Sequence, residues 1–426
     1  MDDCLTLEEA EAYVKGVCFK TGPPTRVGVE LEWLVHDRAD ARLPVAAERM
    51  AEALAPFETP GTLPHRGGIS REPGGQIELS TAPADSLAGC VEAALGDLTV
   101  LRASLAAADL ELRGYGLDPH RDPPPRVVRH PRYRAMEAHF DRAGPWGRVM
   151  MRGTAAVQIS LDAGDDTDGP PGYRYRWRLA HRLGPVLIAA FANSPLWRGR
   201  STGWLSTRQA VWRRIDPTRT RAPDAGTDPR DAWADYALDA QLLCVRRAGS
   251  ADWSAPRGLT FRSWLTGGAV GRPPAIEDLD YHLTTLFPPV RPRGWLELRM
   301  IDAQPGDDGW IVPLAVAAAL LDDPVAADAA YAATEPLCGD DGLPPPEVWT
   351  RAARLGPADP AIGKAVRACF AAADTALAVS GTLARTRRTV AAFAERYAER
   401  GRCPADDQLN ELGRSPATHA PWEGLS

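Results

Sequence analysis

The chain has 426 residues, of which 44% are hydrophobic and 25% charged, and its formal net charge at pH 7 is -7. This composition is typical of a globular protein and excludes a disordered or collagen-like chain. The mild negative charge argues against a nucleic-acid-binding surface.

The amino-terminal stretch MDDCLTLEEAEAYV is acidic and lacks the basic and apolar regions of a signal peptide. A membrane span needs about 18 uninterrupted apolar residues. The nearest stretch, PVLIAAFANSPLW, is broken by Asn193 and Pro195. The 7 cysteines form no CxxC pair and are interpreted as reduced thiols. We therefore expect a soluble, cytoplasmic protein without a membrane segment.

Hydrophobic spacing predicts helices over much of the chain. The expected helices cover residues 7–18, 86–107, 173–191, 206–214, 312–321, 346–355, 360–377 and 382–400. Stretches rich in proline, glycine and aspartate predict loops around 118–131, 216–230 and 248–275. We expect a single catalytic domain over residues 1–405, with strand motifs in 26–310 and mainly helices in 311–405, followed by a polar tail over 406–426.

Four segments alternate polar and apolar residues, as strands with one buried face do. In RVGVELEWLV, Glu30 and Glu32 share one face, while Leu31 and Trp33 lie behind. The other segments are GGQIELST, GTAAVQISLD and RGWLELRMIDAQP, and their polar faces carry Glu78, Gln158, and Glu297 with Arg299. The pattern predicts an α+β protein in which helices pack behind an antiparallel sheet.

Carboxylates dominate the polar face of this sheet. A solvated face explains a single strand of this kind, but like charges gathered on one sheet repel each other unless a cation joins them. Mg²⁺ prefers oxygen ligands and usually shares them with substrate phosphates. The sequence has no GxxxxGK[ST] loop and no GxGxxG after a strand. The pattern therefore favours phosphate chemistry in which metal ions and arginines hold the phosphates.

Other kinds of chemistry have little support in the sequence. There is no GxSxG nucleophile elbow, and no cysteine stands in a nucleophile motif. His130 and His139 have no further His or Cys spacing around them that would indicate a metal site.

Six ordered blocks, spread over about residues 26–310, resemble the plant-type glutamate-cysteine ligase family. They are VGVELEW, SREPGGQIELST, RYRAMEAHF followed by MMRGTAAVQISLD, AAFANSPLWRG, GWLSTRQAVWRRIDPTR and RGWLELRMIDAQP. The blocks are most like the actinobacterial branch, which makes gamma-glutamylcysteine for ergothioneine synthesis. The resemblance implies a glutamine synthetase/guanido kinase-like sheet with a concave active-site face. It also implies ATP-dependent ligation of L-glutamate to L-cysteine through a gamma-glutamyl phosphate, with ATP as co-substrate and Mg²⁺ as cofactor.

The resemblance also implies roles for individual residues. Its metal ligands are Glu30, Glu32, Glu78 and Glu297, and its catalytic pair beside the transferred phosphate is Arg299 with Glu297. Arg208 is implied as the partner of the alpha-carboxylate of glutamate, with Trp212 as a wall of the same pocket. The remaining substrate-binding candidates are Thr154, Glu72, Gln158, Arg132 and Tyr133.

Several of these residues have a second interpretation. Glu72 is also explained as a metal contact or as a plain turn residue. Trp212 is also explained as a core residue, and Arg208 as a surface or ion-pair residue. Arg132 and Tyr133 follow an arginine-rich loop that is also explained as solvated. Gln158 stands where the broader superfamily can have a histidine ligand, so a metal role, a substrate contact and a water-positioning role all stay open.

Two alternatives to the ligase function also stay open. One is a carboxylate-amine ligase that joins glutamate to a different amine, and only the acceptor pocket would distinguish it from the first reading. The other is a non-catalytic nucleotide- or metal-binding homologue. The sequence does not indicate the oligomeric state, and a monomer is compatible with it.

Overall fold

The fold is built around one antiparallel sheet. A computed structural model describes residues 5–224, 228–267 and 270–413 of the chain. Within these residues, seven strands form the sheet in the order β2-β3-β1-β5-β9-β8, and β4 pairs with β1 outside this path. The strands are β1 (Val27–Asp37), β2 (Gly68–Arg71), β3 (Ile77–Ser80), β4 (Leu110–Arg113), β5 (Ala156–Asp162), β8 (Val290–Pro292) and β9 (Trp295–Asp302). Two short strands, β6 (Leu196–Trp197) and β7 (Arg200–Ser201), pair separately. Every neighbouring pair is antiparallel, so the predicted α+β class is confirmed.

The register of β1 brings its carboxylates next to other polar side chains. Glu32 lies opposite Glu78 of β3, and Glu30 lies between Ser80 of β3 and Gln158 of β5. Cross-strand partners project from the same face of a sheet. The polar face predicted from the alternation is therefore continuous across the three strands.

A β-bulge interrupts β9 in the middle of the sheet. Val157 pairs with Ile301 but Ile159 pairs with Leu298, so one residue of β5 lies opposite two residues of β9. The extra residue shifts the alternation of β9 by one position. Asp302, which simple alternation places behind the sheet, therefore returns to the polar side.

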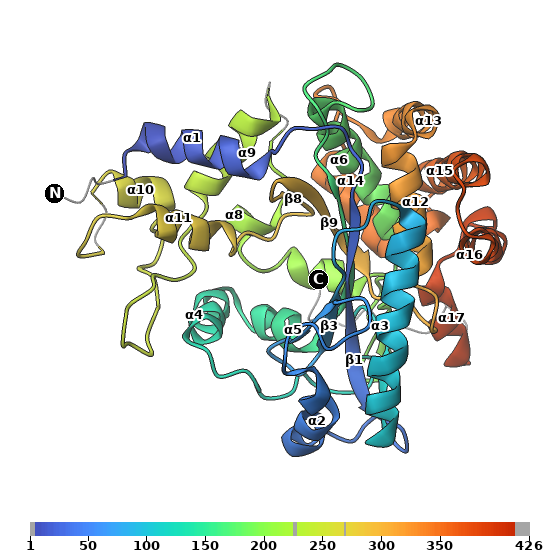
Figure 1. The fold of residues 1–426 in the computed structure, drawn as a ribbon, viewed down its shortest axis with the longest axis horizontal. Helices are drawn as coiled ribbons and strands as arrows, with labels where there is room; N and C mark the ends of the chain where they lie inside the picture. Colours follow the sequence, from blue (N-terminus) through green and yellow to red (C-terminus); the bar gives the residue numbers. More distant parts are fainter. Residues whose placement is uncertain (1–4, 225–227, 268–269, 414–426) are drawn as a thin grey trace.

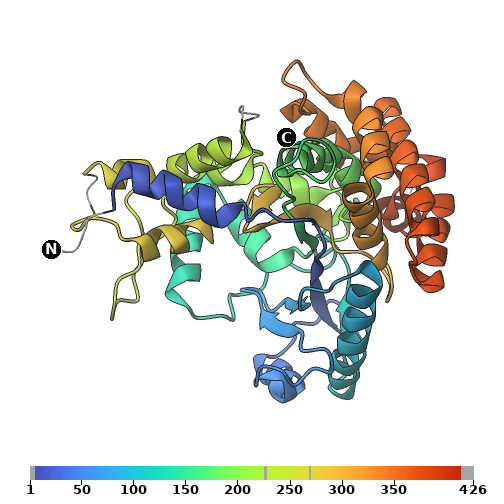
Figure 2. The same ribbon diagram turned by 45° about the horizontal axis from the view of Figure 1, so that its top comes forward.

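Helices cover the apolar side of the sheet, to the right in Figure 1. α3, α6 and α12 contact β1, β9 and β5. Their buried residues share one core with the apolar side chains of the strands, such as Leu31 and Ile159. Outside α12 lie further carboxy-terminal helices, which Figure 2 shows from a second direction. Together, the helices on the apolar side are α3 (Leu87–Ala107), α6 (Tyr173–Ala190), α12 (Ile311–Asp322), α13 (Pro324–Thr334), α14 (Pro346–Leu355), α15 (Pro360–Val379), α16 (Ala384–Arg396) and α17 (Pro404–Glu411).

A second group of helices lies to the left of the sheet in Figure 1. It comprises α1 (Leu7–Cys18), α4 (Pro131–Phe140), α5 (Trp146–Gly153), α8 (Pro217–Thr220), α9 (Pro229–Asp239), α10 (Phe261–Leu265) and α11 (Ile276–Leu283). α7 (Thr207–Trp212) leads into this group, and α2 (Ala47–Leu54) packs on α3. No helix in the described part of the chain combines the length and the apolar character that crossing a bilayer requires.

The structure corrects three expected boundaries. The loops expected over 216–230 and 248–275 contain α8, the start of α9, and α10. The prolines that suggested loops occupy the first turns of α8 and α9, where the missing N–H costs nothing. The tail expected from residue 406 begins inside α17, and residues 414–426 lie outside the described residues.

Candidate active site

Four glutamates gather on the polar face of β1 and β3, and we call them the acidic face: Glu30, Glu32, Glu72 and Glu78. Burial and then the charge of Glu72 raise the pKa of Glu32, while burial and then Glu32 raise the pKa of Glu78. Burial and the charge of Glu78 likewise raise the pKa of Glu72 to about 7. For Glu30 the causes of the raised pKa are burial and the charge of Glu297. Each shift thus combines the cost of burying a carboxylate with repulsion by a neighbouring glutamate.

Glu72 is held in a tight turn before β3. Its N–H donates to the carbonyl of Gln76, and its own carbonyl accepts from Gly75, which has a φ of 90°. The Gln76 amide donates to the carbonyl of Thr154, 2.9 Å away. A Cβ at Gly74 would lie 2.2 Å from the carbonyl oxygen of Arg152. The turn therefore docks against the end of α5 and directs the Glu72 carboxylate towards Glu78.

Glu297 differs from the acidic face because two arginines neutralise it. Arg291 donates to both of its oxygens, at 2.8 and 2.9 Å, and Arg299 donates to it as well. Burial alone would raise the pKa of Glu297, yet the charges of Arg291 and Arg299 hold it at about 2. Arg299 and Glu297 thus lie together as predicted, whereas metal ligation by Glu297 stays a prediction. Arg291 was missed because the short segment Val290–Pro292 shows no alternation.

Gln158 connects the arginines to the acidic face. Its oxygen accepts from Arg299, and its amide nitrogen donates to Glu32 at 2.7 Å. Only a side chain with both a donor and an acceptor can join a guanidinium to a carboxylate in this way. In this structure Gln158 therefore orients both groups.

Arg208 lies on α7 beside the bulge of β9 and is 4% exposed. Its Nη2 donates to the carbonyl of Arg299 at 3.0 Å, and its Nη1 is 3.8 Å from Asp302. Nε and Nη1 are buried without a hydrogen-bond partner among the described residues, as is Nε1 of Trp212. Arg208, Trp212 and Phe287 line one small recess. Unpaired buried donors are costly, so Arg208 suits an anionic partner.

The remaining predicted residues lie around these groups. The hydroxyl of Thr154 donates to the carbonyl of Met150 at 2.7 Å and so helps to end α5; donation to a substrate stays a prediction. Arg132 donates to the hydroxyl and the carbonyl of Thr284, at 2.7 and 2.8 Å. Burial and the charge of Glu72 raise the pKa of Tyr133, which places Tyr133 near the acidic face.

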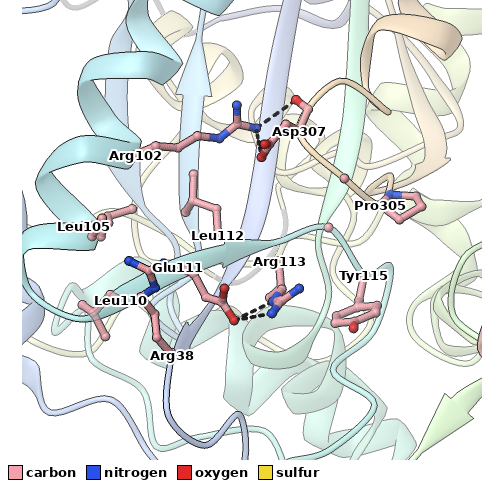
Figure 3. A pocket seen from close by; sticks show the side chains of 13 residues that line it. Arg38, Arg102, Leu105, Leu110, Glu111, Leu112, Arg113, Tyr115, Pro305 and Asp307 are labelled. Carbon is pink, nitrogen blue, oxygen red and sulfur yellow. Dashed lines mark hydrogen bonds and ion pairs between the residues drawn. The ribbon is translucent and has the colours of Figure 1, made fainter. Parts of the chain in front are cut away.

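A cleft of about 270 Å³ lies elsewhere, between α3, β4 and the loop after β9 (Figure 3). Its arginines are largely balanced, because Arg102 pairs with Asp307 and Arg113 pairs with Glu111. The cleft contains none of the predicted site residues. The unbalanced charges lie on the polar face of the sheet, so we place the candidate active site there.

The donor chemistry of the acidic face fits magnesium, because carboxylate oxygens are the ligands that this ion prefers. In residues 5–224, 228–267 and 270–413, however, no three His, Cys, Asp or Glu side chains converge into a ready metal site. The metal-ligand assignment therefore rests on the gathering of negative glutamates on one face of the sheet and on the carboxylate oxygens that they supply.

The chain has clear relatives among known proteins. Residues 26–423 match Glutamate-cysteine ligase family 2 (GCS2). The chain is 41% identical over 405 residues to glutamate-cysteine ligase EgtA of Mycobacterium tuberculosis (strain ATCC 25618 / H37Rv), covering 93% of this chain and 88% of the relative. It is 31% identical over 322 residues to the chloroplastic glutamate-cysteine ligase of Arabidopsis thaliana, covering 71% of this chain and 60% of the plant protein.

A solved structure supports the fold. The glutamate-cysteine ligase of Francisella tularensis, determined in complex with AMP, superposes with a TM-score of 0.55 at 11% identity. The match covers 95% of this chain and 87% of that one. Sequence and fold agree, and the chain belongs to glutamate-cysteine ligase family 2.

Proposed function

We propose that the protein joins the gamma-carboxylate of L-glutamate to the amino group of L-cysteine at the expense of ATP. The product is gamma-glutamylcysteine, and the resemblance to the actinobacterial branch suggests that it serves ergothioneine synthesis. Family membership and the 41% identity to EgtA support this function. The observation that carries it is the acidic face beside Arg299, with the unpaired donors of Arg208 close by. Because glutamate, cysteine and ATP are available in the cytoplasm, we propose that the protein acts there.

The chemistry explains why such a site is needed. A carboxylate is a poor acyl donor because its leaving group would be oxide, and transfer of a phosphoryl group from ATP provides a better one. Phosphoryl transfer depends on positioning and on charge stabilisation. Arg299, held by Glu297 and Gln158, supplies a fixed guanidinium for the transferred phosphate.

Glu30, Glu32 and Glu78 are the residues that would hold Mg²⁺, with Glu297 and Glu72 at the edges of the group. Magnesium bound there would offset the charge of the carboxylates and of the ATP phosphates together. The raised pKa values of these glutamates support the assignment, since burial and the charges of neighbouring glutamates both disfavour their ionised forms.

The glutamate substrate is assigned to the recess of Arg208. Arg208 keeps donors without a partner, which favours an anionic group such as the alpha-carboxylate, and Trp212 lines the same recess. Arg132 and Tyr133 stay candidates for substrate contacts, because they approach the acidic face from α4.

The test is ADP release by the purified protein with Mg²⁺, ATP and glutamate. Cysteine is compared with a panel of other amines, and each product is identified by mass. Release that requires cysteine and yields gamma-glutamylcysteine is the expected result. Release with a different amine would keep the mechanism and change the acceptor, and no release with any amine would contradict the proposal.

A further inference from the structure

Asp302 is a buried carboxylate that the reaction outlined above does not use. It is 2% exposed and lies at the end of β9, just beyond the bulge. Its Oδ2 accepts from the backbone N–H of Asn193 at 2.9 Å and from the hydroxyl of Ser194 at 2.7 Å. Its Oδ1 accepts from the hydroxyl of Ser206 at 2.9 Å and lies 3.8 Å from Nη1 of Arg208.

The partners of Asp302 are the groups that hold α7 in place. The Ser194 hydroxyl accepts from the backbone N–H of Arg208 at 3.1 Å. The Ser206 hydroxyl is the N-cap of α7 and accepts from the N–H of Gln209 at 3.3 Å. The Asp302 carboxylate thus contacts the groups that fix the start of α7 and the backbone of Arg208, and it also lies beside Nη1 of the Arg208 guanidinium.

The bulge itself supplies the remaining anchors. In a regular strand the carbonyls of consecutive residues alternate between neighbouring strands, but a bulge leaves groups unpaired. Here the carbonyl of Arg299 accepts from Arg208 at 3.0 Å, and the carbonyl of Met300 accepts from the Gln209 side chain at 2.8 Å. The bulge therefore ties the arginine assigned to phosphate to the arginine assigned to glutamate.

We propose that Asp302 is a positioning residue for glutamate recognition, which acts by holding the Arg208 guanidinium in one orientation beside the recess. This inference rests on the proposed function, because it takes the ligand of Arg208 to be a substrate carboxylate. A carboxylate beside a buried guanidinium keeps it in one orientation, and a fixed guanidinium binds an anion more tightly than a mobile one.

The test compares Asp302→Asn with the wild-type protein in the full chain. Glutamate binding is measured by calorimetry without ATP, and KM values are measured for glutamate and for ATP. Loss of one partner of a buried charge pair predicts that Kd and KM for glutamate rise about 30-fold, while KM for ATP changes by less than about 2-fold. The matched control is Asp322→Asn, which removes the carboxylate 2.7 Å from the buried Arg176, away from the site. It should leave both constants unchanged.

A milder variant and a double variant complete the design. Ser194→Ala removes one hydrogen bond to Asp302 and should raise KM for glutamate about 3-fold. It decides the question if Asp302→Asn does not fold. In an Arg208→Lys background, Asp302→Asn should add less than about 2-fold, because the two residues act as a unit.

Three results would overturn the proposal. They are unchanged glutamate affinity in Asp302→Asn, an equal loss for glutamate and ATP, and full additivity with Arg208→Lys. Wild-type protein that binds glutamate but forms no gamma-glutamylcysteine would contradict the proposed function alone, since the affinity comparison would still decide the role of Asp302.

Discussion

The contrast between Glu78 and Glu297 leads to opposite expected effects of the same substitution. Glu78 lies opposite Glu32, and the side chains of directly opposed residues are about 5 Å apart at Cβ. At about 6 Å and an effective dielectric constant of about 20, two carboxylates repel each other by roughly 3 kcal/mol. The hydroxyls of Ser70 and Ser80 offset part of this repulsion. We therefore expect Glu78→Gln to stabilise the metal-free protein by about 1–2 kcal/mol at an alkaline pH where both carboxylates are charged, a rise of roughly 1–3 °C in Tm.

The sign of the pH dependence follows from the burial of Glu78 and from the same repulsion. The pKa of Glu78 is raised by folding, so the folded protein binds more protons than the unfolded chain at neutral pH. Stability should therefore fall as the pH rises above the ordinary carboxyl range, and Glu78→Gln should flatten this slope. Glu297→Gln should instead destabilise the fold by about 3–5 kcal/mol, because it leaves Arg291 and Arg299 without their shared carboxylate.

The assay is thermal melting at alkaline pH, where both carboxylates are charged, in EDTA and then in Mg²⁺, for the wild type and both variants. Added Mg²⁺ should raise the Tm of the wild type and have a smaller effect on Glu78→Gln. A lower Tm for Glu78→Gln than for the wild type in EDTA would refute the charge argument. An equal response of both proteins to Mg²⁺ would refute the ligand assignment.

Three further outcomes are expected. Glu30→Gln and Glu32→Gln should each abolish turnover while circular dichroism shows an intact fold, and wild-type activity in both would remove the metal assignment. Arg299→Lys should lower kcat by about 100-fold with a smaller change in KM for glutamate, because an ammonium does not reproduce planar guanidinium contacts; a change in KM alone would reassign Arg299 to substrate binding. Burial would raise the pKa of Asp118, but other contacts, chiefly its hydrogen bond with His36, hold that pKa at about 2. The ionised carboxylate therefore stabilises the fold above its ordinary pKa of 3.8, and this contribution is lost as the pH falls towards 2. Between pH 5 and pH 2, the free energy of unfolding measured by denaturant titration should therefore fall by about 2 kcal/mol less in Asp118→Asn than in the wild type. An equal fall in both proteins would contradict this.

Strand alternation was enough to predict the polar face on which the candidate site lies. Glu30 and Glu32 share a face because side chains two residues apart in a strand do so, and the register then places Glu78 and Gln158 beside them. The first helix was equally readable, since Thr6 and Glu9 form a capping box at its start. These features depend on neighbours in the sequence, which is why the sequence reveals them.

The features that were missed depend on contacts between distant segments. Alternation fails at the bulge, so nothing in RMIDAQP indicated that Asp302 faces the polar side. Arg291 lies in a three-residue edge strand that ends at a proline, too short for a pattern. The one available signal was the charge balance, because a buried Glu297 requires a cation beyond Arg299.

The strand order also bears on how the protein is made. β1 and β3 carry the acidic face and are synthesised early, whereas β8 and β9, which supply Arg291 and Arg299, follow only after most of the intervening chain. Pairings between such distant segments form slowly, because a long loop must close first. Until β9 docks, the paired strands β1 and β3 hold repelling carboxylates without Arg291 and Arg299 beside them. The nascent amino-terminal half should therefore resist premature compaction, and completion of the sheet and of the active centre should be one late, cooperative event.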